Sequence, residues 1–490
     1  MGKQDRYVNI AVDMGASNIR IMAGIFEKDR LQYRELHRFK NEIKEFDGHE
    51  RWDIDAIFDG IIEGLNLAIH EFGHEIRSVG VDSWGVDYVL LDAKGKLIEK
   101  PFAYRDSRTK GMESQWISMM DRKETFERSG INFYSFNTLL QLLSTKENGL
   151  PAAAAHILFV PCYIQYRLCG IMKNELTIAS TSQMLNVNSN EWDSKILNLL
   201  NIPPALMGKV CFPGTLLGEV QNSDLEPNSM SAVAVCAHDT ASAIAAIPSL
   251  GDSFAFISTG TWCIVGMEND QPVLTTRALD EGFTNERGYG NTYRFLKNII
   301  GLWLIQGLKS DLSENATFKE IESLVKESSS ENMIVPAANS FYNPASMKNA
   351  FDEFFLQTGQ NIPADPGSYF KCAYDSLVYS FRYHIEKLEE MTGKIITGIH
   401  LIGGGGQSKY LCSKTAEICN RTVISGPVEA ATLGNILVQA MALKQINSLE
   451  EARQIVLESS DVKSYSPDHP DKDSIARNYS RFLQLRKTIK

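Results

Sequence analysis

The sequence predicts a mixed α/β protein of two domains, and three observations support this fold class. The chain has 490 residues, which is too long for one ordinary hydrophobic core. Strand-like and helix-like segments alternate over its first part. The same strand–turn–strand pattern occurs near the N-terminus and again in the middle of the chain. A pattern that occurs once in each half indicates a duplicated fold.

Both copies of the pattern place small residues at the tip of a turn between two apolar runs. The first copy is Val8–Phe26 and the second is Phe254–Met267. Backbone N–H groups at such a tip can hold an anion, because no side chain blocks close approach. The two turns therefore predict a protein that holds polyphosphate between its halves, as ATP-using proteins do.

Further elements are expected in the first half from hydrophobic periodicity. The helix at Trp52–Phe72 can begin at Asp53 or Asp55, and Gly73 can end it. The other expected elements are a third strand at Leu31–Phe39, a strand with an irregular continuation at Ser78–Val89, a strand at Met230–Ala237 and a helix that begins in His238–Ala246.

The polar stretch of about residues 105–230 reads as a largely helical insertion that decorates the N-terminal domain. Ile247–Asp252 carries a proline and a glycine and is the candidate crossover. The expected domains are therefore residues 1–246 and 247–490.

The second half repeats the alternation of strands and helices. Ile395–Ile402 reads as a strand that ends in the glycine run Gly403–Gly406. The expected helices are Tyr293–Leu308, Ser368–Glu390 and Pro427–Leu443, the last with Glu429 in its first turn.

Composition and charge exclude several classes of protein. The formal net charge of −11 argues against nucleic acid as the main partner. No apolar run reaches the roughly 20 residues of a membrane span, and no secretory signal is recognisable. The eight cysteines form no C-x-x-C pair, so we expect reduced, mostly buried thiols in a cytoplasmic enzyme.

Asp13 follows the first apolar strand and precedes the small residues Gly15–Asn18. A carboxylate at a phosphate turn can hold Mg²⁺ through water, whereas the same letters also suit an ordinary hairpin turn. Ser258–Thr261 repeats the design in the second half and favours the phosphate reading.

The run Gly403–Gly406 does not match the dinucleotide pattern G-x-G-x-x-G, and the chain holds no Walker A sequence. Four consecutive glycines can leave flat backbone against a purine or ribose. A flexible strand–helix turn is the alternative.

His238-Asp239-Thr240 stands between an expected buried strand and a helix. The helix dipole favours an ionised carboxylate there, as a kinase base requires. The local pattern by itself favours the alternative, in which Asp239 is only an N-cap.

Two polar clusters also follow strand ends, where open α/β sheets bind ligands. Trp84–Asp87 and Arg105–Arg108 could recognise a polyol, or the second could be a solvated salt-bridge patch.

His70-Glu71-Phe72-Gly73-His74 matches the H-E-x-x-H pattern of zinc peptidases. The helix is expected to stop at Gly73, between the histidines, so we interpret them as solvated residues at a helix end.

Together these motifs resemble the FGGY family of carbohydrate kinases, over nearly the whole chain. The segments that carry the resemblance are AVDMGAS, SWGVDYVLLD, AYRDSRT, FNTLLQL, AHDTASA, STGTW, LKNIIGLWL and GPVEAATLGNI, in the family's order. The resemblance implies two actin-like (ribonuclease H-like) domains around a deep cleft, as in the actin/hexokinase/Hsp70 fold group.

The resemblance also implies the site. It makes Asp239 the general base and ATP the co-substrate, with Mg²⁺ on ligands that it leaves open. It places the sugar at Gly85, His238, Asp239, Thr240 and Asn298. It places the ATP phosphates on Gly15, Ala16, Ser17, Asn18, Ile19, Arg20 and Thr261, and the adenosine near Gln306 and Gly404. One departure is Ile19, which stands where the turn often has glycine.

The expected substrate is a ketose, L-rhamnulose first, with L-fuculose and L-xylulose as alternatives. The sugar is expected on the first domain and ATP on the second, so that closure of the cleft aligns them and expels water. A non-kinase ATPase of the same fold is the alternative from another class. A monomer or a homodimer is expected, without nucleic-acid or membrane partners.

Overall fold

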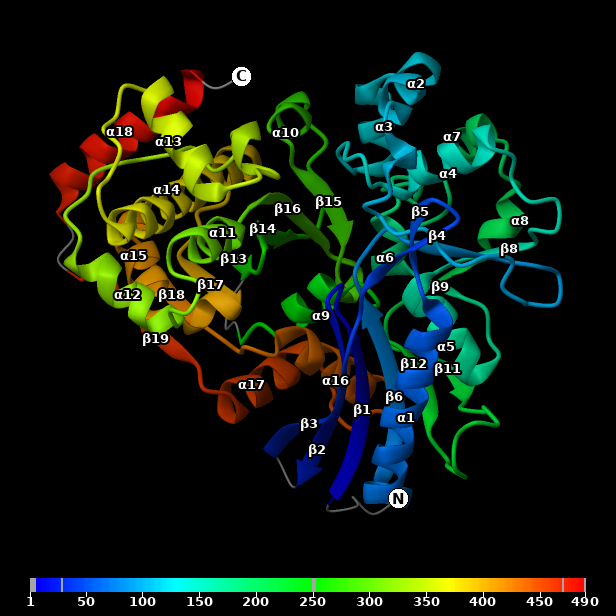
Figure 1. Cartoon of the computed structure of the whole chain (residues 1–490). Coiled ribbons are helices and arrows are strands. Elements are labelled where there is room, and N and C mark those ends of the chain that lie inside the picture. Colours follow the sequence, from blue (N-terminus) through cyan, green and yellow to red (C-terminus); the bar gives the residue numbers. More distant parts are fainter. Residues whose placement is uncertain (1–5, 28–29, 249–252, 469–470, 489–490) are drawn as a thin grey trace. The chain divides into compact units, whose positions relative to one another are not determined.

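A computed structural model describes residues 6–27, 30–248, 253–468 and 471–488 of the chain (Figure 1). The chain forms two compact units. The first comprises residues 1–250, 268–295 and 429–460, and the second comprises residues 251–267, 296–428 and 461–490. Each unit is described by itself below.

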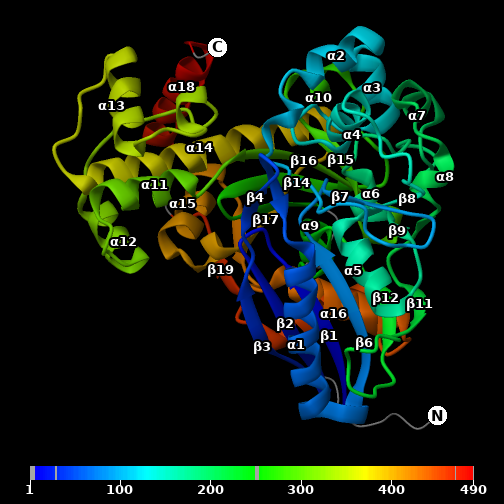
Figure 2. The ribbon, with the colours of Figure 1, turned by 45° about the vertical axis from the view of Figure 1, so that its right-hand side comes forward.

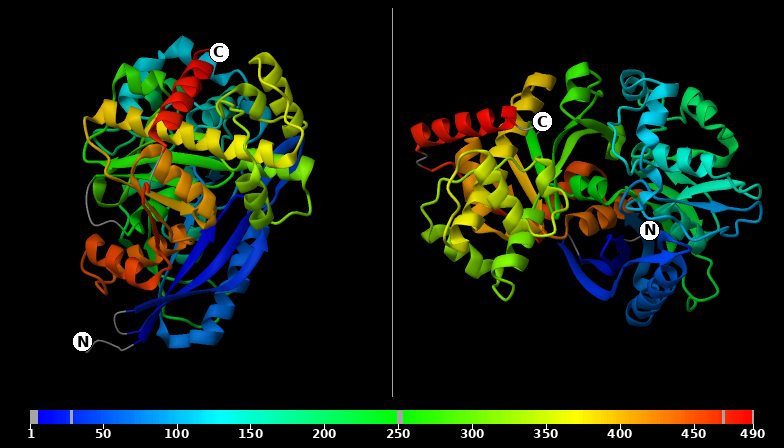
Figure 3. Two further views of the ribbon diagram at one scale, coloured as in Figure 1. Left: turned by 90° about the vertical axis from the view of Figure 1, so that its left-hand side faces the viewer. Right: turned by 45° about the horizontal axis from the view of Figure 1, so that its top comes forward.

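The first unit is built on a six-stranded mixed sheet with the strand order β11-β12-β6-β1-β2-β3. The long strands β1, β2 and β3 run side by side at one end of the sheet (Figure 3). β6 is parallel to both β1 and β12, so these three strands end at the same edge. The strands are β1 (Arg6–Met14), β2 (Asn18–Glu27), β3 (Arg30–Lys40), β6 (Ile76–Ser83), β11 (Thr215–Glu219) and β12 (Ser231–Ala234).

The predicted first hairpin is confirmed. β1 and β2 pair antiparallel, with Asp13 opposite Arg20 and Met14 opposite Ile19. Nearly every side chain of β1 is buried, because helices cover both faces of this part of the sheet.

Helix α1 (Ile54–Phe72) covers one face of the sheet beside β1, β2 and β3 (Figure 2). Its buried residues recur at helical spacing, as its amphipathic sequence predicts. Gly73 ends it with a φ of 49°, as expected. His74 then lies beyond the helix in the 3₁₀ turn η1 (Gly73–Glu75). His70 and His74 are both exposed, so the two histidines of the H-E-x-x-H letters do not share a continuous helix.

Helices α9 (Asp239–Ala245) and α16 (Ala430–Ala442) cover the other face, where α16 packs on β1, β6 and α9. Gly434 of α16 makes this close packing possible. A Cβ atom there would lie 1.7 Å from the backbone oxygen of Ser242 in α9. α17 (Leu449–Ser459) follows beside β3.

The middle of the chain adds short elements to the first unit. They are mainly helical, as expected, although small strand pairs also occur. The helices are α2 (Met112–Met119), α3 (Arg122–Ser129), α4 (Thr138–Glu147), α5 (Val160–Cys169), α6 (Leu176–Ser180), α7 (Ser194–Leu200), α8 (Pro204–Met207) and α10 (Thr276–Asp280), with the 3₁₀ turns η2 (Ser107–Thr109) and η3 (Tyr289–Asn291). The strands are β4 (Ile43–Phe46), β5 (His49–Trp52), β7 (Tyr88–Leu91), β8 (His156–Phe159), β9 (Asn174–Glu175), β10 (Val210–Cys211) and β15 (Thr284–Arg287).

The second unit holds strands in the order β16-β14-β13-β17-β18-β19. β13 and β14 form the predicted second hairpin, and β13, β17 and β18 run parallel. The strands are β13 (Phe254–Thr259), β14 (Trp262–Asn269), β16 (Tyr293–Ile300), β17 (Gly398–Gly403), β18 (Thr422–Ser425) and β19 (Lys463–Tyr465).

Helices accompany this sheet, and the long α14 packs against α11, α12, α15 and α18. They are α11 (Trp303–Leu312), α12 (Phe318–Glu327), α13 (Met347–Gln357), α14 (Pro366–Thr392), α15 (Lys409–Cys419) and α18 (Lys472–Thr488), with the 3₁₀ turns η4 (Asn339–Phe341) and η5 (Gly404–Gln407). The predicted helices Ser368–Glu390 and Pro427–Leu443 are confirmed as α14 and α16, and the glycine run opens η5.

The prediction of one helix over Tyr293–Leu308 is wrong. Tyr293–Ile300 is the strand β16, and α11 begins only at Trp303. Most of β16 is buried on both faces, so its apolar residues do not alternate and resemble a buried helix. Gly301 separates the two elements, because a Cβ atom there would lie 2.6 Å from the backbone nitrogen of Cys263.

The compact units differ from the expected division at residue 246 in two segments. Residues 268–295 and 429–460 belong with the first unit. α16 belongs with the first unit because it packs on β1 and α9. The segment 268–295 belongs there because Asn132 donates a hydrogen bond to the carbonyl of Leu279 at 2.8 Å. The predicted crossover Ile247–Asp252 falls mainly on residues 249–252, which lie outside the described residues. The boundary between domains stays a prediction.

Within the described part of the chain, no helix is both long and apolar enough to cross a membrane.

Candidate active site

Three carboxylates gather at the edge of the first sheet where β1, β6 and β12 end. The β1–β6 register places Asp13 opposite Asp82. Ser83, next along β6, bridges to His238, which follows β12. This bridge brings Asp239 to the same edge. The arrangement follows from parallel strand order, because the carboxyl ends of neighbouring parallel strands open toward one another.

The turn Gly15–Asn18 is tightly organised. The Gly15 N–H donates to the Asn18 carbonyl at 2.9 Å, and a Cβ atom at position 15 would lie 2.9 Å from that oxygen. Asn41 holds the turn from β3's end, through its N–H on the Ser17 carbonyl and its Nδ2 on the Gly15 carbonyl, both at 3.0 Å. Ser17 and Asn18 are exposed at the tip. The tip is therefore open to a ligand while its backbone is held.

Ile19 departs from the family pattern without disturbing this turn. Its side chain is fully buried in the hydrophobic core of the first unit, on β2 opposite Met14. The core therefore accommodates a β-branched side chain at the position where the resemblance often implies glycine.

Arg20 joins the hairpin to α16. Its Nη2 donates to Asp13 at 2.6 Å, and its Nη1 pairs with Glu429, the N-cap residue of α16. Thr432 donates to the same Asp13 oxygen at 2.6 Å. These carboxylates raise the pKa of Arg20 further, against the opposing effect of its burial. Asp13 is thus held from two sides, by Arg20 and by Thr432.

Asp82 was not recognised from the sequence. It is fully buried, and one of its oxygens accepts a 2.5 Å hydrogen bond from Asn435 of α16. Burial, followed by the negative charge of Asp13, raises the pKa of Asp82 well above its usual value. The only signal in the sequence is an acidic residue near the end of a buried strand, which does not distinguish it from a turn residue.

Asp239 is the first residue of α9, and its carboxylate accepts from the Thr240 N–H at 2.5 Å and the Thr240 hydroxyl at 3.1 Å. The N-cap position belongs to His238 instead. Burial raises the pKa of Asp239, His238 acts against that rise, and the negative charge of Asp13 adds to it. Its side chain is still 35% exposed. A carboxylate that binds protons more tightly than usual and remains accessible suits a general base.

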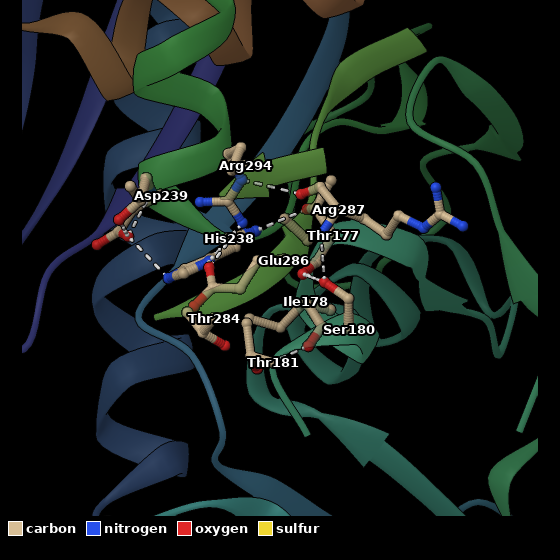
Figure 4. Close-up of polar contacts among 12 residues, drawn as sticks. Thr177, Ile178, Ser180, Thr181, His238, Asp239, Thr284, Glu286, Arg287 and Arg294 are labelled. Carbon is tan, nitrogen blue, oxygen red and sulfur yellow. Dashed lines mark hydrogen bonds and ion pairs between the residues drawn. The ribbon is translucent and has the colours of Figure 1, made fainter. Parts of the chain in front are cut away.

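His238 lies between Asp239 and an ion pair (Figure 4). Its Nε2 is 3.5 Å from Asp239 Oδ1, and its Nδ1 is 3.2 Å from Glu286 and 3.1 Å from Arg294 Nη2. Glu286 and Arg294 were not recognised, because their strands β15 and β16 follow about fifty residues later in the chain.

Glu175 fixes the backbone just before Asp239. It accepts from the Ala237 N–H at 3.0 Å and from the Thr177 hydroxyl at 2.6 Å, and that hydroxyl accepts from the His238 N–H at 3.2 Å. Burial raises the pKa of Glu175 to about 7, although these donors act against the rise. Glu175 therefore links α6 to the start of α9.

The loop Trp84–Asp87, which contains Gly85, is held by a buried hydrogen-bond network around Asp87. Asp87 accepts from the indole nitrogens of Trp52 at 2.7 Å and Trp84 at 3.0 Å, and from Gln141 Nε2 at 3.0 Å. Burial raises the pKa of Asp87 to about 6. Because its oxygens are already occupied, Asp87 orders the loop that carries Gly85, and Gly85 itself lies beside Thr181.

The Arg105–Arg108 cluster is solvated only in part, because Asp106 is buried whereas Arg105 and Ser107 are exposed. Arg108 donates to the Gln141 carbonyl at 2.9 Å and to Thr145 at 2.7 Å, and Asp106 caps the 3₁₀ turn η2. This segment supports the Asp87 network, because Gln141 contacts both Arg108 and Asp87.

The second unit brings the second hairpin turn next to the glycine turn. Thr259 donates to the Ile402 carbonyl at 2.6 Å and accepts from the Gly405 N–H at 2.9 Å. Thr261 accepts from the Gly301 N–H at 3.2 Å, which places it at the start of α11, the helix that carries Gln306. Thr261, Gln306 and the Gly404 turn thus belong to one neighbourhood, and Asn298 lies on β16.

Comparisons with known proteins agree with this architecture. Residues 8–246 match the N-terminal domain of the FGGY family of carbohydrate kinases, and residues 255–443 match its C-terminal domain. The rhamnulokinase of Bacillus subtilis is 36% identical over 475 residues, which cover 96% of this chain and 98% of that protein.

Solved structures share the fold at low identity. A ligand-bound xylulose kinase from Lactobacillus acidophilus has a TM-score of 0.82 at 14% identity, covering 98% of both chains. Plasmodium falciparum glycerol kinase with ADP has a TM-score of 0.83 at 14% identity, covering 99% of this chain and 98% of that one. The fold is therefore that of the actin-like sugar kinases, and the chain belongs to the FGGY family of carbohydrate kinases.

Proposed function

We propose that this carbohydrate kinase transfers the γ-phosphoryl group of ATP to the C1 hydroxyl of L-rhamnulose, giving L-rhamnulose 1-phosphate and ADP, in L-rhamnose catabolism. The observation that carries the choice of sugar is the 36% identity to a rhamnulokinase over 96% of the chain. L-Fuculose and L-xylulose are the alternative acceptors, because kinases for several sugars share this fold.

Asp239 is the proposed general base. Its carboxylate is partly exposed, its proton affinity is raised, and it lies at the sheet edge that also carries the first phosphate turn. It takes the proton of the C1 hydroxyl as that oxygen attacks the γ-phosphorus. Transfer of this kind is loose, so alignment and charge stabilisation contribute more than covalent chemistry.

The other site residues keep their predicted roles in this proposal. Gly85, His238, Thr240 and Asn298 bind the sugar. Gly15 to Arg20 and Thr261 bind the phosphates, and Gln306 and Gly404 lie at the adenosine. The support in the first unit is the exposed, held tip of the hairpin turn.

Mg²⁺ is proposed to arrive with ATP. No group of three or more potential ligands forms a resident metal site among the residues that the structure describes. Mg²⁺ on a nucleotide keeps several waters and needs only one or two carboxylates. Asp13 fits that demand, since its carboxylate stands at the start of the proposed phosphate turn and pairs with Arg20. The eight free, buried cysteines suit the reducing cytoplasm, where we place the enzyme.

A sugar panel tests the function. Purified protein is mixed with ATP and Mg²⁺ and with L-rhamnulose, L-fuculose or L-xylulose, and ADP release is followed. The largest kcat/KM is expected for L-rhamnulose. A higher value for another ketose overturns the substrate, and ADP release that no sugar stimulates favours the non-kinase ATPase.

The Asp239→Asn variant tests the base. Its turnover should fall about 10²–10⁴-fold, with ATP affinity nearly unchanged. Activity within a factor of ten of the unsubstituted enzyme would remove Asp239 from that role.

A further inference from the structure

The ion pair behind His238 is buried and specific. The Arg294 side chain is fully buried, and its Nη2 lies 2.9 Å from the carboxylate of Glu286. Both groups contact the same histidine nitrogen, Nδ1. A buried ion pair adds little to stability compared with an apolar pair of similar volume, so its presence against a site residue points to another purpose.

The pair is held in place from the opposite side. Arg294 Nε donates to the Arg287 carbonyl at 2.9 Å, and the Arg287 N–H donates to the Ser180 hydroxyl at 2.9 Å (Figure 4). Arg287 Nη2 also donates to the Val187 carbonyl at 2.8 Å. The guanidinium of Arg294 therefore has a fixed direction when it meets His238.

The two charges balance each other. Burial acts to raise the pKa of Glu286, but Arg294 and His238 outweigh it and leave that pKa below its usual value. Arginine stays protonated in proteins. The histidine thus faces an ionised carboxylate and a guanidinium whose charges cancel.

Both members of the pair hold the ring of His238 through Nδ1. A guanidinium can only donate hydrogen bonds and an ionised carboxylate can only accept them, and the two lie 3.1 Å and 3.2 Å from this nitrogen. The ring is therefore fixed with its other nitrogen, Nε2, facing Asp239 at 3.5 Å.

We propose that Arg294 and Glu286 are positioning residues of the kinase site. Arg294 and Glu286 hold the ring of His238 with Nε2 facing Asp239, and the carboxylate of Glu286 balances the charge of the Arg294 guanidinium beside the proposed base. This inference rests on the proposed role of Asp239.

The charged and titratable groups around His238 and Asp239 come from several elements. They are Asp13 on β1, Asp82 on β6, Glu175 before α6, Cys236 after β12, Glu286 on β15, Tyr289 in η3 and Arg294 on β16. Arg20 on β2, which pairs with Asp13, is also near. The Glu286–Arg294 pair differs because its two members carry opposite charges and both contact His238.

The test uses this opposite sign. Glu286→Gln leaves the Arg294 charge unbalanced, which should move the acidic limb of the kcat/KM profile to lower pH. Arg294→Met leaves the Glu286 charge unbalanced, which should move the limb to higher pH. An unbalanced charge at this range should shift the limb by roughly one pH unit. The double variant should return it close to its original position.

The kinetic constants add a second measurement. Each single variant should lower kcat roughly tenfold and raise the KM of the sugar, while the KM of ATP changes by less than about threefold. Arg421→Met is the matched control in the second unit. Arg421 Nε also donates to a carbonyl, that of Ile396 at 2.7 Å, and its Nη2 also pairs with a glutamate, Glu389, at 2.7 Å. Its pH profile should not move.

Acidic limbs that stay in place, or that move in the same direction in both single variants, overturn the proposal. Glu286→Gln preserves shape and is decisive if Arg294→Met fails to fold. The profiles are recorded with whichever ketose the unsubstituted enzyme phosphorylates best. Preference for another ketose therefore overturns the substrate and leaves this test intact, whereas an active Asp239→Asn variant overturns the base itself.

Discussion

Gly434→Ala should separate α16 from α9, the helix that begins with the proposed base, Asp239. The added Cβ atom would lie 1.7 Å from the backbone oxygen of Ser242 and 2.5 Å from its carbonyl carbon, whereas real Cβ atoms stay at least 3.0 Å from other heavy atoms. Backbone cannot rotate out of the way as a side chain can. α16 and α9 must therefore move apart by more than an ångström.

The energy follows from two opposing effects. Overpacking costs about 1–3 kcal/mol and occasionally more, and a backbone collision this close belongs at the upper end. Alanine gains back about 1 kcal/mol of helix propensity over glycine. We expect the free energy of unfolding of the first unit to fall by about 2 kcal/mol, which corresponds to a Tm decrease of roughly 4–8 °C. Asp239, at the start of α9, should move as well, so kcat should also fall.

Thermal unfolding by circular dichroism and steady-state kinetics measure these effects. Gly60→Ala in α1 is the matched control, because it makes the same substitution inside a helix but meets only the ring tip of Phe39, at 2.7 Å. A ring can turn, so its Tm should change by less than half as much. A Gly434→Ala variant with the original Tm and kcat would refute the close backbone contact between α16 and α9.

Three further predictions address the charged groups. Asp87 should destabilise the fold as pH rises, because its pKa in the folded protein, about 6, lies above the ordinary value of 3.8. The stability that it contributes below pH 4 is lost between pH 4 and 6 and amounts to about 3 kcal/mol. Urea unfolding of the unsubstituted protein should show this loss relative to Asp87→Asn. Arg20→Met should raise the KM of ATP about 10–100-fold, through loss of a charge-assisted contact that holds Asp13 and the phosphate turn, and an unchanged KM would contradict this role. Removal of Mg²⁺ with EDTA should abolish turnover. Asp13→Asn should raise the Mg²⁺ concentration that is needed to restore turnover. Turnover that survives EDTA would exclude a role for Mg²⁺ in the reaction.

The sequence was most informative where one local pattern determines the structure. The two hairpins have apolar strands around turns of small residues, so both could be predicted with their ends. The helix at α1 and its stop at Gly73 followed from periodicity and one glycine. Tyr293–Ile300 could not be assigned in this way, because burial on both faces removes the alternation that identifies a strand.

Within the candidate site, too, residues in a local sequence pattern could be predicted, whereas residues placed by long-range strand pairing could not. Asp239 was predictable because it stands at a strand–helix junction within a recognisable segment. Asp82, Glu286 and Arg294 were not, because their positions depend on sheet register and on strands that are distant in the sequence. No local pattern encodes that β15 and β16 return to the end of β12.

Three carboxylates, Asp13, Asp82 and Asp239, lie close together at the edge of the first sheet. Three carboxylates at adjacent strand ends would repel one another strongly if all were ionised and unpaired. Arg20 and Thr432 stabilise the charge on Asp13, whereas burial and Asp13 itself favour the protonated form of Asp82. Asp13 can then remain available to phosphate-bound Mg²⁺, and its charge still raises the proton affinity of Asp239. The proposed base, Asp239, therefore lies near Asp13, which raises its proton affinity, and near Asp82, whose own pKa is raised by burial. Replacing Asp82 by asparagine should then disturb turnover far less than replacing Asp13, although Asp82 is the more deeply buried of the two.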